Sequence, residues 1–236
     1  MRDRPLRYVP RPVLMFLVLS LVLQIAFNVR PTTLSARLDK LAAPPDIATL
    51  RLLSLGEPIA LAKALMLYTQ SFDNQTGAQI PLARLDYPIL ESWLDHIQAL
   101  DPASQYPLLM ASRIYAEVAE PDRQRSMLEF IYTHFFEDPN HRWPWLAHAA
   151  IIAKHRLHDL PLARKYAQAI RLSANDPGIP HWASQMEIFI LEDMEEQQSA
   201  QILLGALLET GQITDPEELR FLNNRLKMHS FDSSPN

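Results

Sequence analysis

The amino-acid sequence predicts an all-α protein in which one apolar helix precedes an array of antiparallel helix pairs. Three observations carry this prediction: a long uncharged apolar stretch near the N-terminus, a series of helix-start signals, and an Asp-Pro dipeptide that recurs at nearly constant spacing. No segment alternates apolar and polar residues as a half-buried strand does, so no sheet is expected.

The N-terminal segment has the pattern of a membrane anchor. Four arginines precede an uncharged stretch over residues 13–29, which as a helix would be roughly 25 Å long against a bilayer core of about 30 Å. The excess of arginine before this stretch predicts a single-pass transmembrane helix with its N-terminus in the cytoplasm and the rest of the chain on the far side. A cleaved signal peptide and a helix buried in the body are the two alternatives.

Three polar side chains share one face of this helix. Ser20, Gln24 and Asn28 follow one another at intervals of four residues. Such a face is typical of interhelical hydrogen bonding, so it is a candidate contact with another membrane helix, from a second copy or from a partner subunit. The alternative is an anchor that tolerates polar residues without using them.

The chain divides into four predicted segments. Residues 1–30 form the basic tip and the anchor, 31–46 a proline-rich linker, 47–228 a helical domain, and 229–236 a flexible tail. Within the helical domain, an Asp or Glu followed closely by proline marks several helix starts. The sequence predicts ten helices there, near residues 47–55, 58–72, 88–99, 104–118, 121–136, 143–157, 160–173, 179–193, 195–209 and 216–227.

The Asp-Pro dipeptides recur with a nearly fixed period. They begin at Asp101, Asp138, Asp176 and Asp215, and each interval of 37, 38 or 39 residues contains two predicted helices. One antiparallel pair cannot bury its apolar face alone, whereas stacked pairs can, and this arrangement is an α-solenoid.

The helical domain resembles the tetratricopeptide repeat (TPR) family over roughly residues 86–215. Leu157 to Ile170 is similar to the second helix of that repeat, with these residues at its packing positions: Ala163, Tyr166 or Ala167, and Ile170. Trp143 to Ala153 is similar to the first helix, and Asp176-Pro177 to the proline that ends a repeat. The chain also resembles membrane-anchored periplasmic repeat proteins of Gram-negative bacteria. The resemblance implies a TPR-like scaffold whose body faces the periplasm from the bacterial inner membrane.

Aromatic residues follow the Asp-Pro dipeptides at the start of each predicted first helix. In a solenoid of this kind the first helices line the concave surface, so aromatic rings there, with polar residues one or two turns on, are a candidate site for an extended peptide or a partner helix. The alternative is that the rings pack successive repeats together, as Trp143-Pro144-Trp145 indicates. The candidate partner-binding residues are Tyr106, Arg113, Trp143, His148, Trp182 and Gln185.

Composition and motifs argue against a catalytic, metal or cofactor site. With no cysteine the chain has no disulfide, Cys-ligated metal or thiol nucleophile, and with 5 glycines against 19 prolines it has no glycine-rich phosphate loop. The net charge of −5 argues against a general nucleic-acid-binding protein. A spacing of seven separates His134, His141, His148 and His155, which is about 10.5 Å along a helix and too far to share a metal. No metal, no cofactor and no catalytic residue is expected.

The sequence therefore predicts a non-enzymatic, membrane-anchored scaffold or adaptor. It would bind a protein partner in the periplasm and support assembly of an envelope or membrane complex, with self-association through the anchor helix as a further expectation. The first alternative is a permanent accessory subunit of a membrane complex, held through Ser20, Gln24 and Asn28. The second is a hydrolase whose catalytic residues the sequence does not reveal.

Overall fold

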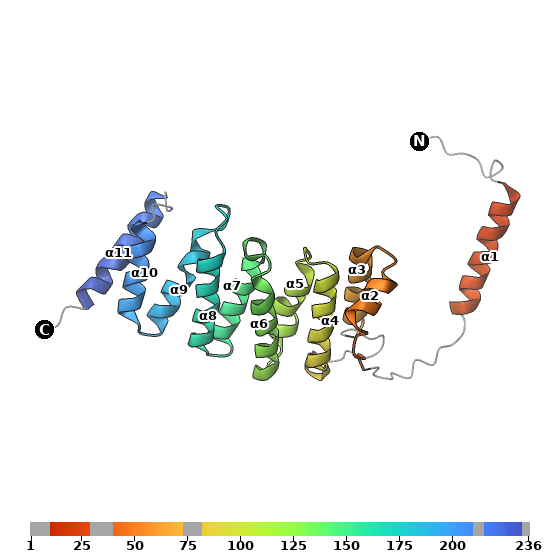
Figure 1. The fold of residues 1–236 in the computed structure, drawn as a ribbon, viewed down its shortest axis with the longest axis horizontal. Coiled ribbons are helices and arrows are strands. Elements are labelled where there is room, and N and C mark those ends of the chain that lie inside the picture. The colour runs from red at the N-terminus through yellow and green to blue at the C-terminus, as the bar shows by residue number, and fades with distance from the viewer. Residues whose placement is uncertain (1–9, 29–39, 73–81, 210–214, 233–236) are drawn as a thin grey trace. The chain divides into compact units, whose positions relative to one another are not determined.

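The computed structural model describes residues 10–28, 40–72, 82–209 and 215–232. Within these ranges the chain forms eleven α-helices and no strand (Figure 1), which confirms the prediction of an all-α protein. The chain divides into two compact units, and the described residues from Lys40 on belong to the second.

The first unit contains α1 (Arg11–Asn28), an 18-residue helix that includes most of the predicted anchor. Its large apolar side chains from Val13 to Ile25 are mostly exposed. Among the residues that the structure describes, no helix combines the length and the apolar character needed to cross a membrane. The expected helix is therefore present, but the expectation that it spans a membrane is not met.

The second unit, which we call the body, begins at Asp39. All ten helices predicted from the sequence are present there, with two short 3-10 helices, η2 (Leu82–Arg84) and η3 (Tyr115–Glu117). The α-helices of the body are α2 (Ile47–Leu53), α3 (Pro58–Gln70), α4 (Tyr87–Leu100), α5 (Tyr106–Arg113), α6 (Pro121–Phe135), α7 (Pro139–His155), α8 (Leu160–Ser173), α9 (His181–Asp193), α10 (Gln197–Glu209) and α11 (Pro216–Asp232).

Aspartate caps begin several of these helices, as the sequence predicts. The Asp46 carboxylate accepts the Thr49 N–H at 2.9 Å, and Asp159 accepts the Leu162 N–H at 3.0 Å in the same way. Asp215 accepts backbone N–H groups in the first turn of α11. These carboxylates satisfy donors that have no partner inside the helix, and proline in the first turn has no donor to lose.

Three helices differ by four or more residues from their predicted extent. One is α11, which ends at Asp232 and not at residue 227, so it includes the start of the predicted flexible tail. The helix expected over residues 104–118 ends at Arg113, because Ile114 leaves the helical conformation (φ −121°, ψ −59°) and η3 follows it. The helix expected to begin at residue 143 begins at Pro139, so that Pro144 lies inside α7. Pro144 lies early in that helix, where its missing N–H removes a single backbone hydrogen bond.

One continuous apolar core runs through most of the body. Its buried side chains extend from Leu41 to Ile190, and a smaller cluster at the C-terminal end consists of Ile188, Leu191, Ala200, Leu204 and Leu222. Leu41 belongs to the predicted linker, yet it is buried, and the next carbonyl, that of Ala42, accepts a 2.7 Å hydrogen bond from Trp93 Nε1. The described part of the linker therefore lies against α4.

Contacts between helices recur with the period of the Asp-Pro dipeptides. From α3 on, helices that follow one another in the chain pack together, and α4 also contacts α6 while α5 contacts α7. Most side-chain bonds between distant residues join positions 32 to 40 apart in the chain. Examples are Gln70–Tyr106, Glu91–Ser126, Glu129–Lys165, Asn140–Asn175, Lys154–Asp193 and Gln185–Glu218.

Candidate partner-binding surface

The six candidate binding residues lie in pairs on alternate helices of the body. Tyr106 and Arg113 are the first and last residues of α5, Trp143 and His148 lie on α7, and Trp182 and Gln185 lie on α9. Side-chain contacts link these helices in order. The sequence therefore identified residues that the fold distributes along one row of helices, but their surroundings differ.

Trp143 and Trp182 contact one another across α7 and α9. Their ring centroids are 5.4 Å apart with an interplanar angle of 70°, the edge-to-face geometry that aromatic rings prefer. On the other side, Trp145 Nε1 donates a 2.8 Å hydrogen bond to Gln105 Oε1, just before α5. The segment Trp143-Pro144-Trp145 thus contacts the helix pairs before and after it, as the packing alternative predicts. Trp182 nevertheless stays 48% exposed.

Tyr106 lies at a small hollow between α3, α4 and α5. Its hydroxyl accepts a 2.7 Å hydrogen bond from Gln70 Nε2 of α3. The hollow has a volume of about 150 Å³ and an apolar floor that includes Met66 and Ile97, with the charged residues Lys63 and Asp101 also lining it. The exposed ring of Tyr106 can therefore contribute both packing and a hydrogen-bonding group at this point.

His148, in the middle of α7, lies beside a charged cluster that contains Arg113, Glu117 and Arg156. His148 Nε2 lies 3.9 Å from Glu117 Oε1, and Glu117 also forms an ion pair with Arg156. Burial lowers the pKa of His148, and the positive charge of Arg113 lowers it further, so the imidazole is neutral near pH 7. His148 therefore acts as a neutral, half-buried side chain, while Arg113 is exposed.

Gln185 is engaged by another helix of the same chain. Its side chain is buried, and its Nε2 donates a 2.5 Å hydrogen bond to Glu218 Oε1 of α11. A second bond joins the same two helices, because Arg225 of α11 forms an ion pair with Glu192 of α9. The amide of Gln185 is thus used to hold α11 against α9, which sequence reasoning had no means to foresee.

Sequence reasoning missed one exposed residue on this row of helices. Ile151 lies on α7, one turn beyond His148, and is 45% exposed although its neighbours Ala150 and Ile152 are buried. The signal that could have found it is the spacing of Pro144, His148, Ile151 and His155, which follows a single face of a helix. Ile151 thus adds an exposed apolar side chain to the row of helices that carries Tyr106 and Trp182.

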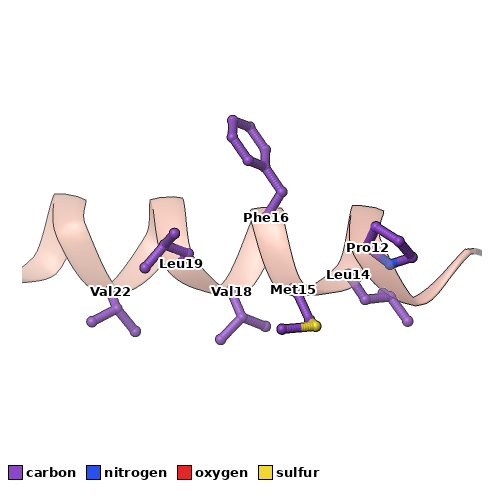
Figure 2. A pocket seen from close by; sticks show the side chains of 7 residues that line it. All are labelled: Pro12, Leu14, Met15, Phe16, Val18, Leu19 and Val22. Atoms are coloured by element: carbon purple, nitrogen blue, oxygen red, sulfur yellow. The ribbon is translucent and has the colours of Figure 1, made fainter.

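The polar face predicted on α1 is described only in part. The Ser20 hydroxyl donates a 2.9 Å hydrogen bond to the Leu17 carbonyl of its own helix, Gln24 is exposed, and the side chain of Asn28 lies outside the described residues. Figure 2 shows apolar side chains of α1, with Val18 and Val22 pointing away from Phe16. All the side chains that line the pocket in Figure 2 belong to α1. This pocket is therefore part of the exposed surface of a single helix.

The histidines that the sequence singled out pair with carboxylates in two cases. His134 Nε2 lies 2.8 Å from Asp95 Oδ1 and its Nδ1 lies 3.0 Å from Glu137 Oε1, while His141 Nδ1 contacts Asp138. Within the described ranges, no group of three or more histidine or acidic side chains has the arrangement of a metal site. These pairs connect α6 with α4 and close the turn before α7.

Comparisons with known proteins identify no relative of this chain. No protein-family model matches the chain, and neither the curated proteins nor the solved structures contain a significant match. The fold and the surface together therefore define the chain at the level of its class, an all-helical protein whose helix-to-helix contacts recur along the chain.

Proposed function

We propose that this protein is a TPR-like helical-repeat scaffold, an α-solenoid that binds a protein partner along one surface. This surface, which we call the recognition face, consists of Tyr106, Arg113, Ile151 and Trp182 on α5, α7 and α9. The occupant we propose is an amphipathic helix or an extended peptide that places apolar side chains against the rings. The role is one of assembly, in which binding rather than catalysis is the activity.

The recurrence of contacts supports the solenoid. Ser126 of α6 bonds to Glu91 of α4, and Lys165 of α8 bonds to Glu129 of α6, one repeat further on. The second helices α6 and α8 thus each contact the second helix before them through a side-chain bond to a glutamate. The first helices do likewise through Trp143 and Trp182. Stacked pairs that contact only their neighbours are the defining arrangement of a solenoid.

One observation carries the proposed binding role: Trp182 remains almost half exposed in a body whose other described tryptophans are buried or half-buried. Tryptophan, tyrosine and arginine are the side chains that most often dominate binding energy at protein interfaces. The recognition face offers one of each, with an exposed isoleucine on α7. Such a set favours a protein partner over a small polar ligand.

Affinity capture with matched variants tests the proposal. The tagged full chain is crosslinked in native cells and isolated, and what copurifies is compared for the unmodified chain, Trp182→Ala and Ile151→Asp. Leu172→Asp is the control, because Leu172 is 61% exposed on α8, outside the recognition face. We expect one near-stoichiometric partner whose recovery falls at least tenfold, the equivalent of about 1.4 kcal/mol, in both face variants and is unchanged in the control.

The melting temperature separates binding from folding. Trp182 packs on Trp143, so Trp182→Ala removes a packing contact as well as an exposed ring. Ile151→Asp changes an exposed side chain and is expected to leave the melting temperature within a few degrees. If recovery of the partner falls only in proportion to the amount of folded protein, the aromatic rings serve folding and not binding. Recovery that is equal in all four chains would contradict the recognition face.

The predicted location and the predicted accessory-subunit role stay predictions. They place the body in the periplasm of a bacterium at the inner membrane, and protease added to spheroplasts is expected to remove it. The accessory-subunit alternative predicts that the partner survives changes in the recognition face but is lost with Gln24→Leu on α1. Resistance of the body to protease until the cells are lysed would contradict the location.

A further inference from the structure

The most exposed large apolar side chain among the described residues, Leu55, lies at the turn between α2 and α3, far along the chain from the recognition face. Leu52, Leu53 and Leu55 are exposed there, Leu52 to 78% and Leu55 to 91%, and Ile59 extends the feature onto α3. We call these four residues the leucine turn. Soluble surfaces carry single apolar residues, whereas contiguous groups mark a surface that meets something else.

The backbone holds the leucine turn in a defined shape. Leu55 has φ +51° and Gly56 φ +91°, and the left-handed region is unfavourable for a leucine. Hydrogen bonds fix the turn, from Leu55 N–H to the Leu52 carbonyl at 3.2 Å and from Glu57 N–H to the Ser54 carbonyl at 2.9 Å. A bulky apolar side chain is therefore held outward at a position where glycine or asparagine would be less strained.

Charge separates this end of the chain from the rest. Within the body, residues 40–72 contain three Lys and Arg against two Asp and Glu, whereas residues 73–236 contain 13 against 23. Beside the leucine turn, Arg51 and Lys63 are exposed, with Glu57 as the acidic residue between them. An apolar projection flanked by exposed basic side chains, in the part of the body without the acidic excess, is complementary to a surface with an apolar interior and anionic headgroups.

We propose that the leucine turn inserts into the interface of a membrane that contains anionic lipids. Leucine side chains would enter the boundary between headgroups and acyl chains, while Arg51 and Lys63 stay at the level of the phosphates. A projecting turn suits this occupant, because a lipid surface yields to it and needs no complementary pocket. The inference depends neither on the recognition face nor on whether α1 crosses a membrane.

The absence of cysteine from the chain makes a site-specific test direct. A single cysteine is introduced into the full chain as Leu55→Cys and labelled with an environment-sensitive fluorophore. The matched control is Leu172→Cys on the exposed surface of α8. Both proteins are mixed with phosphatidylcholine vesicles with and without phosphatidylglycerol, and with vesicles whose acyl chains are brominated near the headgroup. Both retain α1, so attachment through α1 is the same in the two proteins.

The expected result is that emission from position 55 shifts to shorter wavelength on vesicles that contain phosphatidylglycerol, and that bromine quenches it about threefold more than it quenches position 172. Equal quenching at the two positions would overturn the proposal. A shift at position 55 that depends on protein concentration and not on lipid would also overturn it, in favour of contact with a second copy. Labelled Leu53→Cys, which changes the neighbouring leucine, is expected to reproduce the result if folding is intact.

Discussion

The helices in the middle of the body and those at its C-terminal end are held by different kinds of contact. In α7, buried side chains extend around more than half of the helix, and four of them are alanines: Ala147, Ala149, Ala150 and Ala153. In α10 only Ala200 and Leu204 are buried, and among the residues of α11 whose side chains are described only Leu222 is. Small residues allow α7 to approach its neighbours closely, whereas α10 presents a single narrow stripe.

Polar contacts show the same difference. In the middle, Arg142 is fully buried and joins the end of α6 to the segment after α4. At the C-terminal end, α11 is joined to α9 by the bonds Gln185–Glu218 and Arg225–Glu192. The middle therefore combines a continuous apolar core with an internal polar bridge, and the C-terminal end depends on a small cluster and a few polar pairs. Stability should follow this order along the chain.

The largest effect is expected from Arg142→Ala. The guanidinium donates to the carbonyls of His134 and Pro102, each at 2.5 Å, and pairs with Glu137 at 2.5 Å. Removing it leaves buried acceptors without a donor and opens a void, so we expect the free energy of unfolding to fall by about 3 to 5 kcal/mol. Denaturant unfolding measures this. The exposed Arg113→Ala is the control, with an expected change within about 0.5 kcal/mol, and equal effects would contradict the bridge.

The next effect compares the two apolar clusters directly. Leu146→Ala in α7 and Leu222→Ala in α11 each truncate a buried leucine, a change that costs about 2 to 5 kcal/mol. We expect the first to lower amide protection throughout the body, since α7 contacts several helices. The second should lower protection in α10 and α11 alone. Hydrogen exchange followed by mass spectrometry measures both effects. If Leu222→Ala lowers amide protection equally throughout the body, the two regions unfold as one.

The smallest effect is a pH dependence carried by His134. Burial lowers the pKa of His134, but its hydrogen bonds with Asp95 and Glu137 outweigh burial and raise the pKa above its ordinary 6.5. The folded state therefore holds the proton more tightly than the unfolded state does. The resulting stabilisation is fully present below about pH 6.5 and is lost as the pH rises through the folded-state pKa.

His134→Gln measures this contribution. The difference in unfolding free energy between the unmodified chain and the variant is expected to be larger at about pH 6 than at about pH 8.5. His148→Gln is the contrast, because burial lowers the pKa of His148 and its protonation opposes folding. For that variant the stability lost at acidic pH should shrink. A difference for His134→Gln that grows with pH would contradict the assignment.

Much of the fold could be predicted because its signals are local. Carboxylate caps such as Asp159 and first-turn prolines lie within four residues of the groups that they affect, so they mark helix starts without knowledge of the tertiary structure. The break at Ile114 has no such signal. The burial of Leu41 in a proline-rich segment depends on α4, which lies more than 40 residues away in the sequence.

The candidate surface was predictable to a lesser extent. The period of the Asp-Pro dipeptides correctly placed Tyr106, Trp143 and Trp182 on alternate helices. It could not show that Gln185 is occupied by Glu218, or that Arg142 is buried, because both depend on which side chains meet across helices. A charged residue is expected at the surface unless its partners are known, and those of Arg142 are backbone carbonyls.

Site-specific photo-crosslinking in intact native cells tests the central claim, the recognition face, most directly. A photoreactive amino acid is placed at position 182 of the full chain, and in a separate chain at position 172. We predict one dominant crosslinked protein from position 182, absent from position 172 and lost when Ile151→Asp is added. The same crosslinked products from both positions, or none from position 182 while the chain is folded, would contradict the account.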